Sequence, residues 1–403
     1  MPSSKNSVNN EGILVYIESF NKQAGTVLMD FIDSNEFNAF NSRLNFNNNV
    51  GNASMILVKN YFQKKIQENT IYLIKNETID LLFQKQSINF GNNNIDSFVI
   101  GYEITLDTSI ENLFEKSIYM SQLDLFLKGI RSFRTSNINE LSISVKGNVK
   151  ANIRNVGQGN WNELITDNLT SIVFDIGAPI NAKKEEVLLI INNREFIYQE
   201  NKPILLISHW DIDHYHALVA MEDKTLASFS YVIFRDYRPT LTSRIIFGRF
   251  ERNLERNKII SLSSEPKVKG KAILKLLSPE NSQILIFNAS EHKDRNRNGI
   301  VLLIRTANSS IIFSGDVYYY QLSEYVLNHI NYDHNHYLVV PHHGGNAGKF
   351  IYELKQAKPN DAIISVGTNT YKHPSQQNRD KLREMGFKKI KLTSEIKDIE
   401  VNL

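Results

Sequence analysis

The sequence predicts an α/β fold for residues 141–403, with β-sheets covered by helices, and a smaller α+β region before it. From about Leu141 onward, short apolar runs alternate with polar turns, and only a few helical segments separate them. Polar, potentially reactive side chains follow several of these runs directly. All ten histidines lie between His209 and His373, so histidine chemistry belongs to this C-terminal part.

The region before residue 141 divides into a tail and a candidate domain. Residues 1–12 are rich in Ser and Asn without apolar periodicity, which predicts disorder. Residues 13–140 contain no histidine and one helix-like run near Ile110–Ile130. Their strand-like runs are ILVYIES, TIYLIK and FVIGYEITL. The turn signal near residue 140 is weak, so this region is either a separate domain, able to bind a protein partner, or an extension packed on the sheets.

The apolar runs after residue 141 are short enough to be strands. They are LSISV, SIVFDIG, PILLIS, YVIFRD, AILKLLS, QILIF, GIVLLI, SSIIFSGD, HYLVVP and DAIISVG. Helices are expected at HYHALVAME and over Gln321–Ile330, and Ser375 is a candidate N-cap for a helix over Gln376–Met385.

Composition narrows the class of protein. With 403 residues and 41% hydrophobic residues, the chain can bury a sizeable core and form two or three domains. No apolar stretch reaches the about eighteen residues of a membrane span, and the N-terminus has no signal-peptide core, so a cytoplasmic protein is expected. The lack of cysteine excludes disulfides and thiolate metal ligands. The net charge of +3 is only mildly basic, so a nucleic-acid partner requires a local basic face.

The segment Ser208–His216 is the strongest functional signal, because four potential metal ligands follow an apolar strand in the pattern H-x-D-x-D-H. His209 and Asp211 can turn toward one dication, and Asp213 and His214 toward a second. Imidazole with carboxylate suits zinc or manganese. The alternative is that Asp caps the following helix. Capping explains one or two carboxylates but not two histidines beside them.

Two later segments supply further candidate ligands. Asp316 follows the strand of SSIIFSGD, where its two oxygens can each face one ion, although strand-Gly-Asp is also a common turn. His342 and His343 follow HYLVVP. Adjacent histidines point in different directions, so one can bind metal while the other serves the substrate. Pro and Gly around them fix the loop and allow close approach of a ligand.

The other histidines carry weaker signals. His373 stands alone before Pro374, a position more typical of a structural turn than of a catalyst. The rest have no spacing partners and are interpreted as surface or hydrogen-bonded residues: His216, His292, His329, His334 and His336.

Taken in order, six segments resemble the metallo-β-lactamase superfamily, and more narrowly the hydrolase domain of the ComEC-like competence proteins, over roughly residues 141–395. NVGQGN from Asn155 is similar to DVGQGD, and FDIG with Asp175 to the strand-ending DxG. SHWDIDH is similar to THxDxDH, FSGDV to GD, VPHHGG to PHHGS, and ISVGTNTYKHP to SVGxNxYGHP. Six motifs in one order are far more specific than any one of them.

The resemblance implies a four-layer αβ/βα sandwich with a dinuclear metal site between the strand ends. It assigns His209 and Asp211 to one metal and Asp213 and His214 to the other. Asp316 would bridge the two metals, and His342 would complete the site. Asp175 would orient one of the ligating histidines.

Three departures limit the resemblance. Many superfamily members place a ligating His before the bridging Asp, whereas the stretch Asn296–Gly299 has none, so one metal would be weakly held. Asn155 replaces an Asp. ComEC proteins embed this domain among transmembrane helices, which this chain lacks, so the DNA-import role does not transfer.

The expected function is a metal-dependent hydrolase that uses a hydroxide bridging two metals to attack phosphorus or an acyl carbon. Asp213 would orient the nucleophile, and His343 or His373 would bind the substrate or protonate the leaving oxygen. The resemblance points to a phosphodiesterase, in particular a nuclease. The basic residues near the site fit two interpretations equally well: they bind a phosphate backbone, or they belong to a solvated loop. Candidate substrate-binding residues are Lys372, Asn298 and Arg297.

Two other functions remain open. One is a small-molecule hydrolase: a lactonase, an amidase or a cyclic-nucleotide phosphodiesterase. The other is a non-catalytic module that binds nucleic acid or a partner protein. Retention of all six candidate ligands argues against the binding module, because degenerate members usually lose one or two.

Overall fold

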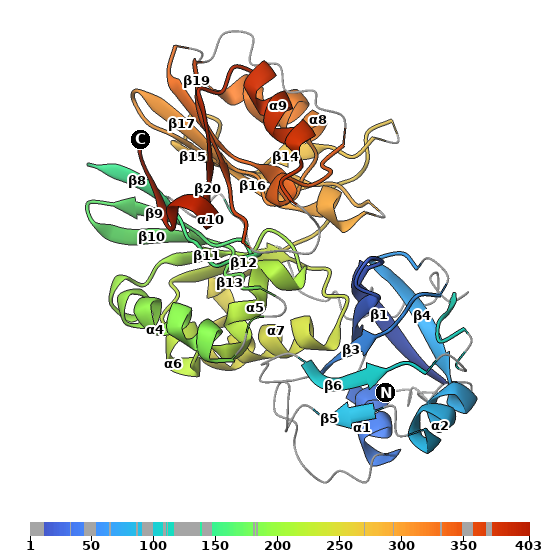
Figure 1. The fold of residues 1–403 in the computed structure, drawn as a ribbon. Coiled ribbons are helices and arrows are strands. Elements are labelled where there is room, and N and C mark those ends of the chain that lie inside the picture. The colour runs from blue at the N-terminus through green and yellow to red at the C-terminus, as the bar shows by residue number, and fades with distance from the viewer. Residues whose placement is uncertain are drawn as a thin grey trace. The chain divides into compact units, whose positions relative to one another are not determined.

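A computed structural model describes residues 12–32, 34–43, 54–63, 66–85, 88–90, 100–107, 110, 112–116, 138, 147–179, 182, 184–269, 271–292, 294–330, 333–348, 358–367 and 373–403. The chain divides into two compact units (Figure 1). The first comprises Met1–Ser132 with Arg238–Gly248, and the second comprises Phe133–Tyr237 with Arg249–Leu403. The sequence predicts one boundary near residue 140 and gives no sign that residues 238–248 return to the first unit.

A seven-stranded sheet forms the first unit, in the order β5-β6-β3-β2-β1-β4-β7. Neighbouring strands are antiparallel except for the parallel pair β3 and β6. The strands are β1 (Gly12–Asn21), β2 (Thr26–Phe31), β3 (Met55–Lys59), β4 (Thr70–Lys75), β5 (Ile88–Phe90), β6 (Ile100–Thr105) and β7 (Glu115–Lys116). The helices are α1 (Ser34–Arg43) and α2 (Asn76–Gln84).

The three strands expected in this unit are confirmed as β1, β4 and β6. The helix expected near Ile110–Ile130 is wrong for the part that the structure describes, because residues 112–116 run into strand β7. Residues 117–130 of that expectation lie outside the described residues, as does the tail at 1–11.

The core of the first unit includes the first half of helix α7 (Leu241–Asn253). Leu241 is buried in the same apolar cluster as Phe31, Phe40 and Tyr102. Asp30 of β2 is fully buried and accepts hydrogen bonds from Ser54 Oγ and from the backbone N–H of Thr242, both at 3.0 Å. This segment of α7 therefore completes both the apolar core and a buried polar contact.

Two seven-stranded sheets form the second unit. The first has the order β13-β12-β11-β10-β9-β8-β21, antiparallel from β21 to β10 and parallel from β10 to β13. Its strands are β8 (Val149–Ile153), β9 (Asn162–Thr166), β10 (Leu169–Phe174), β11 (Ile204–Leu206), β12 (Tyr231–Arg235), β13 (Ile259–Leu262) and β21 (Ile399–Asn402).

The second sheet has the order β14-β15-β16-β17-β18-β19-β20, antiparallel from β14 to β17 and parallel from β17 to β20. Its strands are β14 (Leu274–Leu276), β15 (Ile284–Ala289), β16 (Ile300–Arg305), β17 (Ser309–Phe313), β18 (Asn335–Val339), β19 (Lys358–Ile364) and β20 (Lys389–Leu392).

One apolar core lies between these two sheets. Phe174 and Leu206 of the first sheet belong to the same buried cluster as Leu302 and Phe313 of the second, and the Phe174 and Phe313 rings are 5.6 Å apart. A second cluster lies on the other face of the second sheet and includes Leu322 and Leu382 of the helical segments. The strands are apolar on both faces because both faces are covered.

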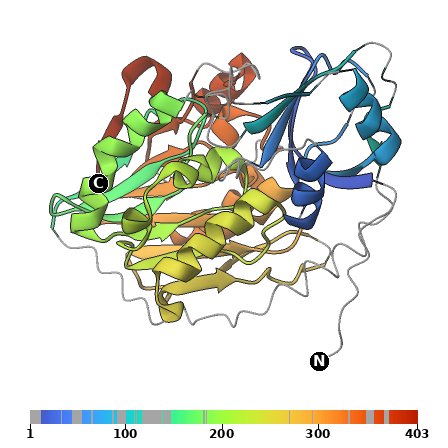
Figure 2. The same cartoon turned by 90° about the horizontal axis from the view of Figure 1, so that it is seen from below.

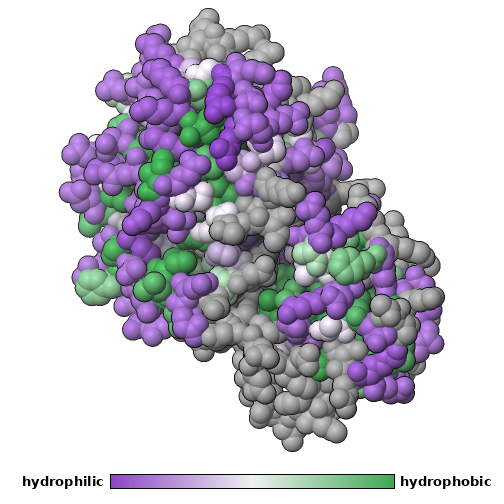
Figure 3. Space-filling view, viewed as in Figure 1, coloured by the Kyte–Doolittle hydropathy of each residue, from purple (hydrophilic) through white to green (hydrophobic). Residues whose placement is uncertain are grey.

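Helices cover the outer faces of the two sheets (Figures 1 and 2). On the first sheet they are α4 (Lys184–Asn201), α5 (Ile212–Ala220), α6 (Asp223–Leu226) and the end of α7. On the second they are α8 (Tyr319–Gln321), which continues through η4 (Leu322–Val326) and η5 (Leu327–His329), and α9 (Gln376–Glu384). The short α10 (Thr393–Ile396) precedes β21. The face of this unit seen in Figure 3 is mainly hydrophilic, as expected of a solvated surface.

Most expected elements of this unit are confirmed. Nine of the ten apolar runs form strands β10 to β12 and β14 to β19, and the tenth, LSISV, lies outside the described residues. Helix α9 begins after Ser375, whose Oγ accepts a hydrogen bond from Asn378 N at 3.2 Å, as expected of an N-cap. Among the described residues, no helix is long and apolar enough to span a bilayer.

Candidate metal centre

The loop between β11 and α5 positions the four residues of the H-x-D-x-D-H pattern. His209 and His214 are buried. Asp211 directly precedes helix α5 in extended conformation, yet its carboxylate makes no capping hydrogen bond. One oxygen of Asp211 lies 3.3 Å from His209 Nε2, and the other pairs with Arg295. Asp211 therefore faces the histidines and not the helix, contrary to the capping alternative.

Asp316 lies between these two histidines. Its Oδ1 is 3.2 Å from Nε2 of His214, and its Oδ2 is 3.9 Å from Nε2 of His209. Gly315, with φ of +52°, makes the turn out of β17 that brings Asp316 there. A Cβ on Gly315 would lie 3.0 Å from the side chain of Ser208, so glycine also permits the close approach of the two loops.

The turn η6 (Pro341–Gly344) after β18 places its two histidines differently. Both have left-handed backbone, with φ of +55° at His342 and +52° at His343. His343 is buried, donates from Nδ1 to the Ser365 carbonyl at 2.7 Å, and directs Nε2 to within 3.2 Å of Asp213. His342 is 30% exposed, and its Nδ1 lies 2.7 Å from Asp316.

Asp175 holds His214 from behind. Its carboxylate lies 2.8 Å from Nδ1 of His214 and accepts hydrogen bonds from the backbone N–H and Oγ of Ser208 and from Nδ2 of Asn160. Asp175 itself adopts φ of +61° at the end of β10. Because Nδ1 of His214 is engaged with Asp175, only Nε2 can serve another partner.

Three buried imidazole nitrogens thus point into one place. The Nε2 atoms of His209, His214 and His343 have no hydrogen-bond partner, and carboxylates lie nearby. Two groups of side chains have ligand atoms within 4.8 Å of one another: His209, His214 and Asp316, and Asp213, His214 and His343. Buried, unpaired imidazole nitrogens beside carboxylates are the donor set that zinc and manganese bind, so these residues fit a metal.

The ionisable groups of the cluster stabilise one another's charges. Burial alone would raise the pKa values of Asp211 and Asp316, but Arg295 lowers the former and His214 lowers the latter, so both lie below the usual range. Burial alone would lower the pKa of His214, but Asp316 and Asp175 raise it well above its usual value. Without a metal, protonated imidazole and guanidinium balance these carboxylates.

The other predicted site residues lie around this cluster. The His373 ring is 6.0 Å from that of His342, and burial, reinforced by the neighbouring histidines, lowers the pKa of His373 to about 4. Asn298 donates to the His292 carbonyl at 2.8 Å. The Arg297 guanidinium lies over the Tyr318 ring, 4.0 Å from its centroid. Lys372 lies outside the described residues.

Four further residues contribute to the cluster, and the sequence indicated none of these contacts, since it suggested only that Arg295 is one of the basic residues near the substrate. Ser208 and Asn160 hold Asp175, Asn296 contacts His342 Nδ1 at 3.1 Å, and Arg295 pairs with Asp211. Asn160 replaces the last Asp of the DVGQGD pattern. The Asp175 carboxylate accepts hydrogen bonds, so an amide that can donate one suits position 160. The change from Asp to Asn there is the sequence feature that could have indicated this hydrogen bond.

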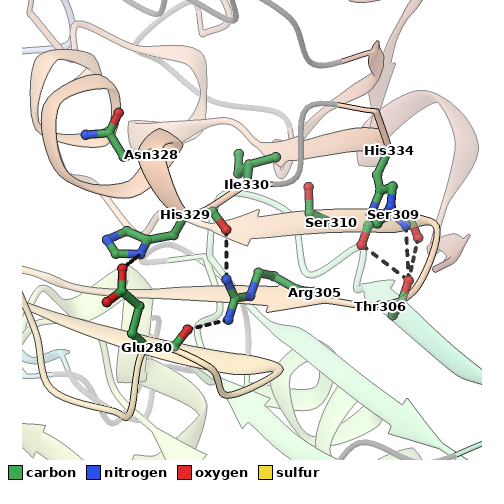
Figure 4. A pocket seen from close by; sticks show the side chains of 9 residues that line it. All are labelled: Glu280, Arg305, Thr306, Ser309, Ser310, Asn328, His329, Ile330 and His334. Carbon is green, nitrogen blue, oxygen red and sulfur yellow. Dashed lines mark hydrogen bonds and ion pairs between the residues drawn. The ribbon is translucent and has the colours of Figure 1, made fainter.

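The described residues of the second unit line a small cavity and a larger one. One of about 20 Å³ lies beside the cluster, between His209, Arg235 and Asn298. The other, of about 360 Å³, lies between Arg305, Ser310 and His329 (Figure 4). Ser310 lies at the start of β17, whereas Asp316 follows its end. The larger cavity is therefore at the end of the strands opposite to the candidate metal centre.

The comparisons with known proteins give distant similarities only. No family model and no curated protein matches the chain. Among solved structures, the metallo-β-lactamase fold protein YhfI from Bacillus subtilis matches with a TM-score of 0.37 and 9% identity, over 64% of this chain and 100% of that one. Human tRNase Z, short form, matches with a TM-score of 0.32 and 12% identity, over 62% of this chain and 98% of that one. Similarities this distant carry no weight for the site.

Proposed function

We propose that the second unit is a four-layer αβ/βα sandwich of the metallo-β-lactamase type and acts as a metal-dependent hydrolase. The observation that carries this proposal is the convergence of three buried, unpartnered Nε2 atoms, from His209, His214 and His343, on carboxylates of Asp213 and Asp316. Other buried polar atoms also lack a hydrogen bond, His216 Nε2 among them, but the three Nε2 atoms of the cluster differ in that they converge on carboxylates.

Two dications, zinc or manganese, are the cofactors that this donor set suits. When bound, they would supply a water of lowered pKa and neutralise charge on the substrate oxygens. Asp213, His214 and His343 would hold one ion, and His209 and Asp211 would hold the other. Asp316 would lie between them.

The sequence predicts His342 as the metal ligand and His343 as the group that serves the substrate. The geometry favours the opposite assignment. His343 is buried, and its backbone hydrogen bond leaves Nε2 unpartnered, which suits a ligand. His342 is partly exposed beside Asp316, which suits a group that holds a proton for the leaving oxygen. His373, close to His342, would face the substrate.

We propose a phosphodiester substrate, with nucleic acid as the foremost candidate. The Arg297 guanidinium lies 4.0 Å from the centre of the Tyr318 ring, and its side chain remains 30% exposed, which offers a cation and an aromatic ring to a phosphate backbone and its bases.

The test is a metal-dependent substrate panel on the full chain. Protein stripped of metal would be reloaded with manganese or zinc and assayed on single- and double-stranded DNA, RNA, a chromogenic phosphodiester, a lactone and a β-lactam. We expect phosphodiester cleavage that Asp213→Asn abolishes and that the exposed control Asp380→Asn retains. Cleavage of the lactone or the β-lactam alone would refute the nuclease assignment, and inactivity on every substrate with full metal loading would favour a binding module.

A further inference from the structure

The second unit holds a buried arginine inside the candidate metal centre. Arg295 lies in the turn η3 (Arg295–Asn298), is only 5% exposed, and pairs with an oxygen of Asp211. The turn is fixed by Asp294, whose Oδ1 accepts a hydrogen bond from Asn296 N at 3.1 Å. From the sequence, the basic residues of this segment are expected to bind substrate or to lie in a solvated loop, whereas the Arg295 side chain is buried.

This arginine makes the two halves of the cluster unequal. Asp211, beside His209, already has a full positive charge against one oxygen. Asp213, in the other half, pairs within the described residues with two imidazoles, His214 and His343. The half around Asp213 thus pairs a carboxylate with imidazoles, and the half around Asp211 pairs a carboxylate with imidazole and with a guanidinium.

A guanidinium cannot give up its proton at any physiological pH. A dication near Asp211 would therefore meet a like charge in a buried place, where repulsion is poorly screened. Displacing Arg295 would instead leave a buried, unpaired guanidinium, which is costly. Either route weakens metal binding at this half, whereas the ion pairs of Asp213 among the described residues are with histidines.

We propose that Arg295 serves as a built-in cation that makes the site bind one metal tightly, through Asp213, His214 and His343, and the second weakly, through His209 and Asp211. This inference rests on the proposed metal-dependent function and specifies how the site is filled. It assigns to Arg295 control of metal stoichiometry.

The test measures metal binding and not activity. Full-length protein, stripped of metal, would be titrated with Mn²⁺ and with Zn²⁺ by calorimetry and equilibrium dialysis. We expect one tight equivalent in the wild type and a second at least about tenfold weaker, on the scale by which groups next to ligands alter metal affinity. Arg295→Met, which keeps length and loses charge, should tighten the second equivalent by about tenfold or more. Arg295→Lys should leave it weak.

The matched control is Arg297→Met, in the same turn but stacked on Tyr318, which should leave both equivalents unchanged. Should Arg295→Met fail to fold, Asp211→Asn provides a second test: the tight equivalent should persist, whereas Asp213→Asn should abolish it. Two equally tight equivalents in the wild type, an unaltered second equivalent in Arg295→Met, or loss of the tight equivalent in Asp211→Asn would overturn this inference alone. A wild type that binds no metal would overturn the proposed function with it.

Discussion

The carboxylate of Asp175 lies 2.8 Å from Nδ1 of His214, and the Nε2 atom on the far side of the ring lies 3.2 Å from Asp316. One hydrogen bond thus sets which nitrogen of a buried imidazole is presented to the candidate metal centre. Asp175 is itself held by Ser208 and Asn160, so the orientation of the ring is fixed before any ligand arrives.

Replacing Asp175 should therefore weaken metal binding without removing a ligand. We expect Asp175→Asn to lower metal affinity by about 10- to 100-fold, because the ring loses its acceptor. Calorimetric titration would measure this. Asp167→Asn, at the exposed turn between β9 and β10, is the control and should bind metal like the wild type. Equal affinities in the two variants would show that Asp175 does not orient His214.

Replacing His342 and replacing His343 should have different effects on metal content and on turnover. His343→Ala should lose metal, since it removes a buried Nε2 from the cluster. His342→Gln should retain metal and lose turnover, by about 10²-fold or more if its imidazole transfers a proton. Metal content by mass spectrometry and kcat on the active substrate measure the two effects. The reverse pattern would restore the assignment made from sequence.

A buried carboxylate outside the site should govern the stability of the second unit. Glu163 is inaccessible and bonds to Arg154, Arg194 and Tyr198. Glu163→Gln removes the carboxylate that Arg154 and Arg194 share and leaves Arg154 with Asp398 alone, so we expect a loss of about 3–5 kcal/mol in the free energy of unfolding. Denaturant titration followed by tryptophan fluorescence would report it, because Trp161 donates a 2.7 Å hydrogen bond to Tyr198 in the same network.

The control for Glu163 is Glu400, whose ion pair with Lys150 is half exposed. Glu400→Gln should cost less than about 1 kcal/mol, as solvent-exposed ion pairs usually do. A similar small loss in both variants would mean that the Glu163 network contributes little net stability.

The first unit should lose stability as pH rises, through Asp30. Burial raises the pKa of Asp30 above its ordinary value of 3.8, despite hydrogen bonds from Thr242 and Ser54. A carboxyl with a raised folded-state pKa favours folding while protonated, so its contribution is complete below about pH 3.8 and is lost as pH rises through the folded-state pKa.

Calorimetry of the wild type and Asp30→Asn across this range would test the effect. The variant should gain on the wild type as pH increases, since an amide does not ionise. Asp80→Asn, which is 61% exposed on α2, should follow the wild type at every pH. A constant difference between wild type and Asp30→Asn would contradict the titration of Asp30.

Local sequence patterns predicted the strands and one helix start well. The apolar run of β17 and the N-cap Ser375 before α9 could both be predicted because the residues that determine each structure are neighbours in the chain. The grouping of His209, His214 and Asp316 came from motif order, since nothing local to each motif shows that strands of different sheets end at the same place.

Side-chain contacts between residues far apart in the chain could not be predicted from the sequence. Arg295 and Asp211 are far apart in the chain, and their pairing depends on how η3 packs against the loop after β11. Left-handed backbone at both His342 and His343 likewise decides which imidazole is buried, and the sequence Pro-His-His-Gly does not distinguish them.

The chain enters the first unit twice, once at its N-terminal end and again over residues 238–248. A fragment ending near residue 140 would therefore lack Leu241 and Thr242. It would have a gap in its apolar core, and Asp30 would keep the Ser54 hydrogen bond but lose the one from the Thr242 N–H. Such a truncation is a poor choice for isolating a partner-binding module. Joining the two segments by a short linker, or keeping the whole polypeptide, is the better choice for studying what the first unit binds.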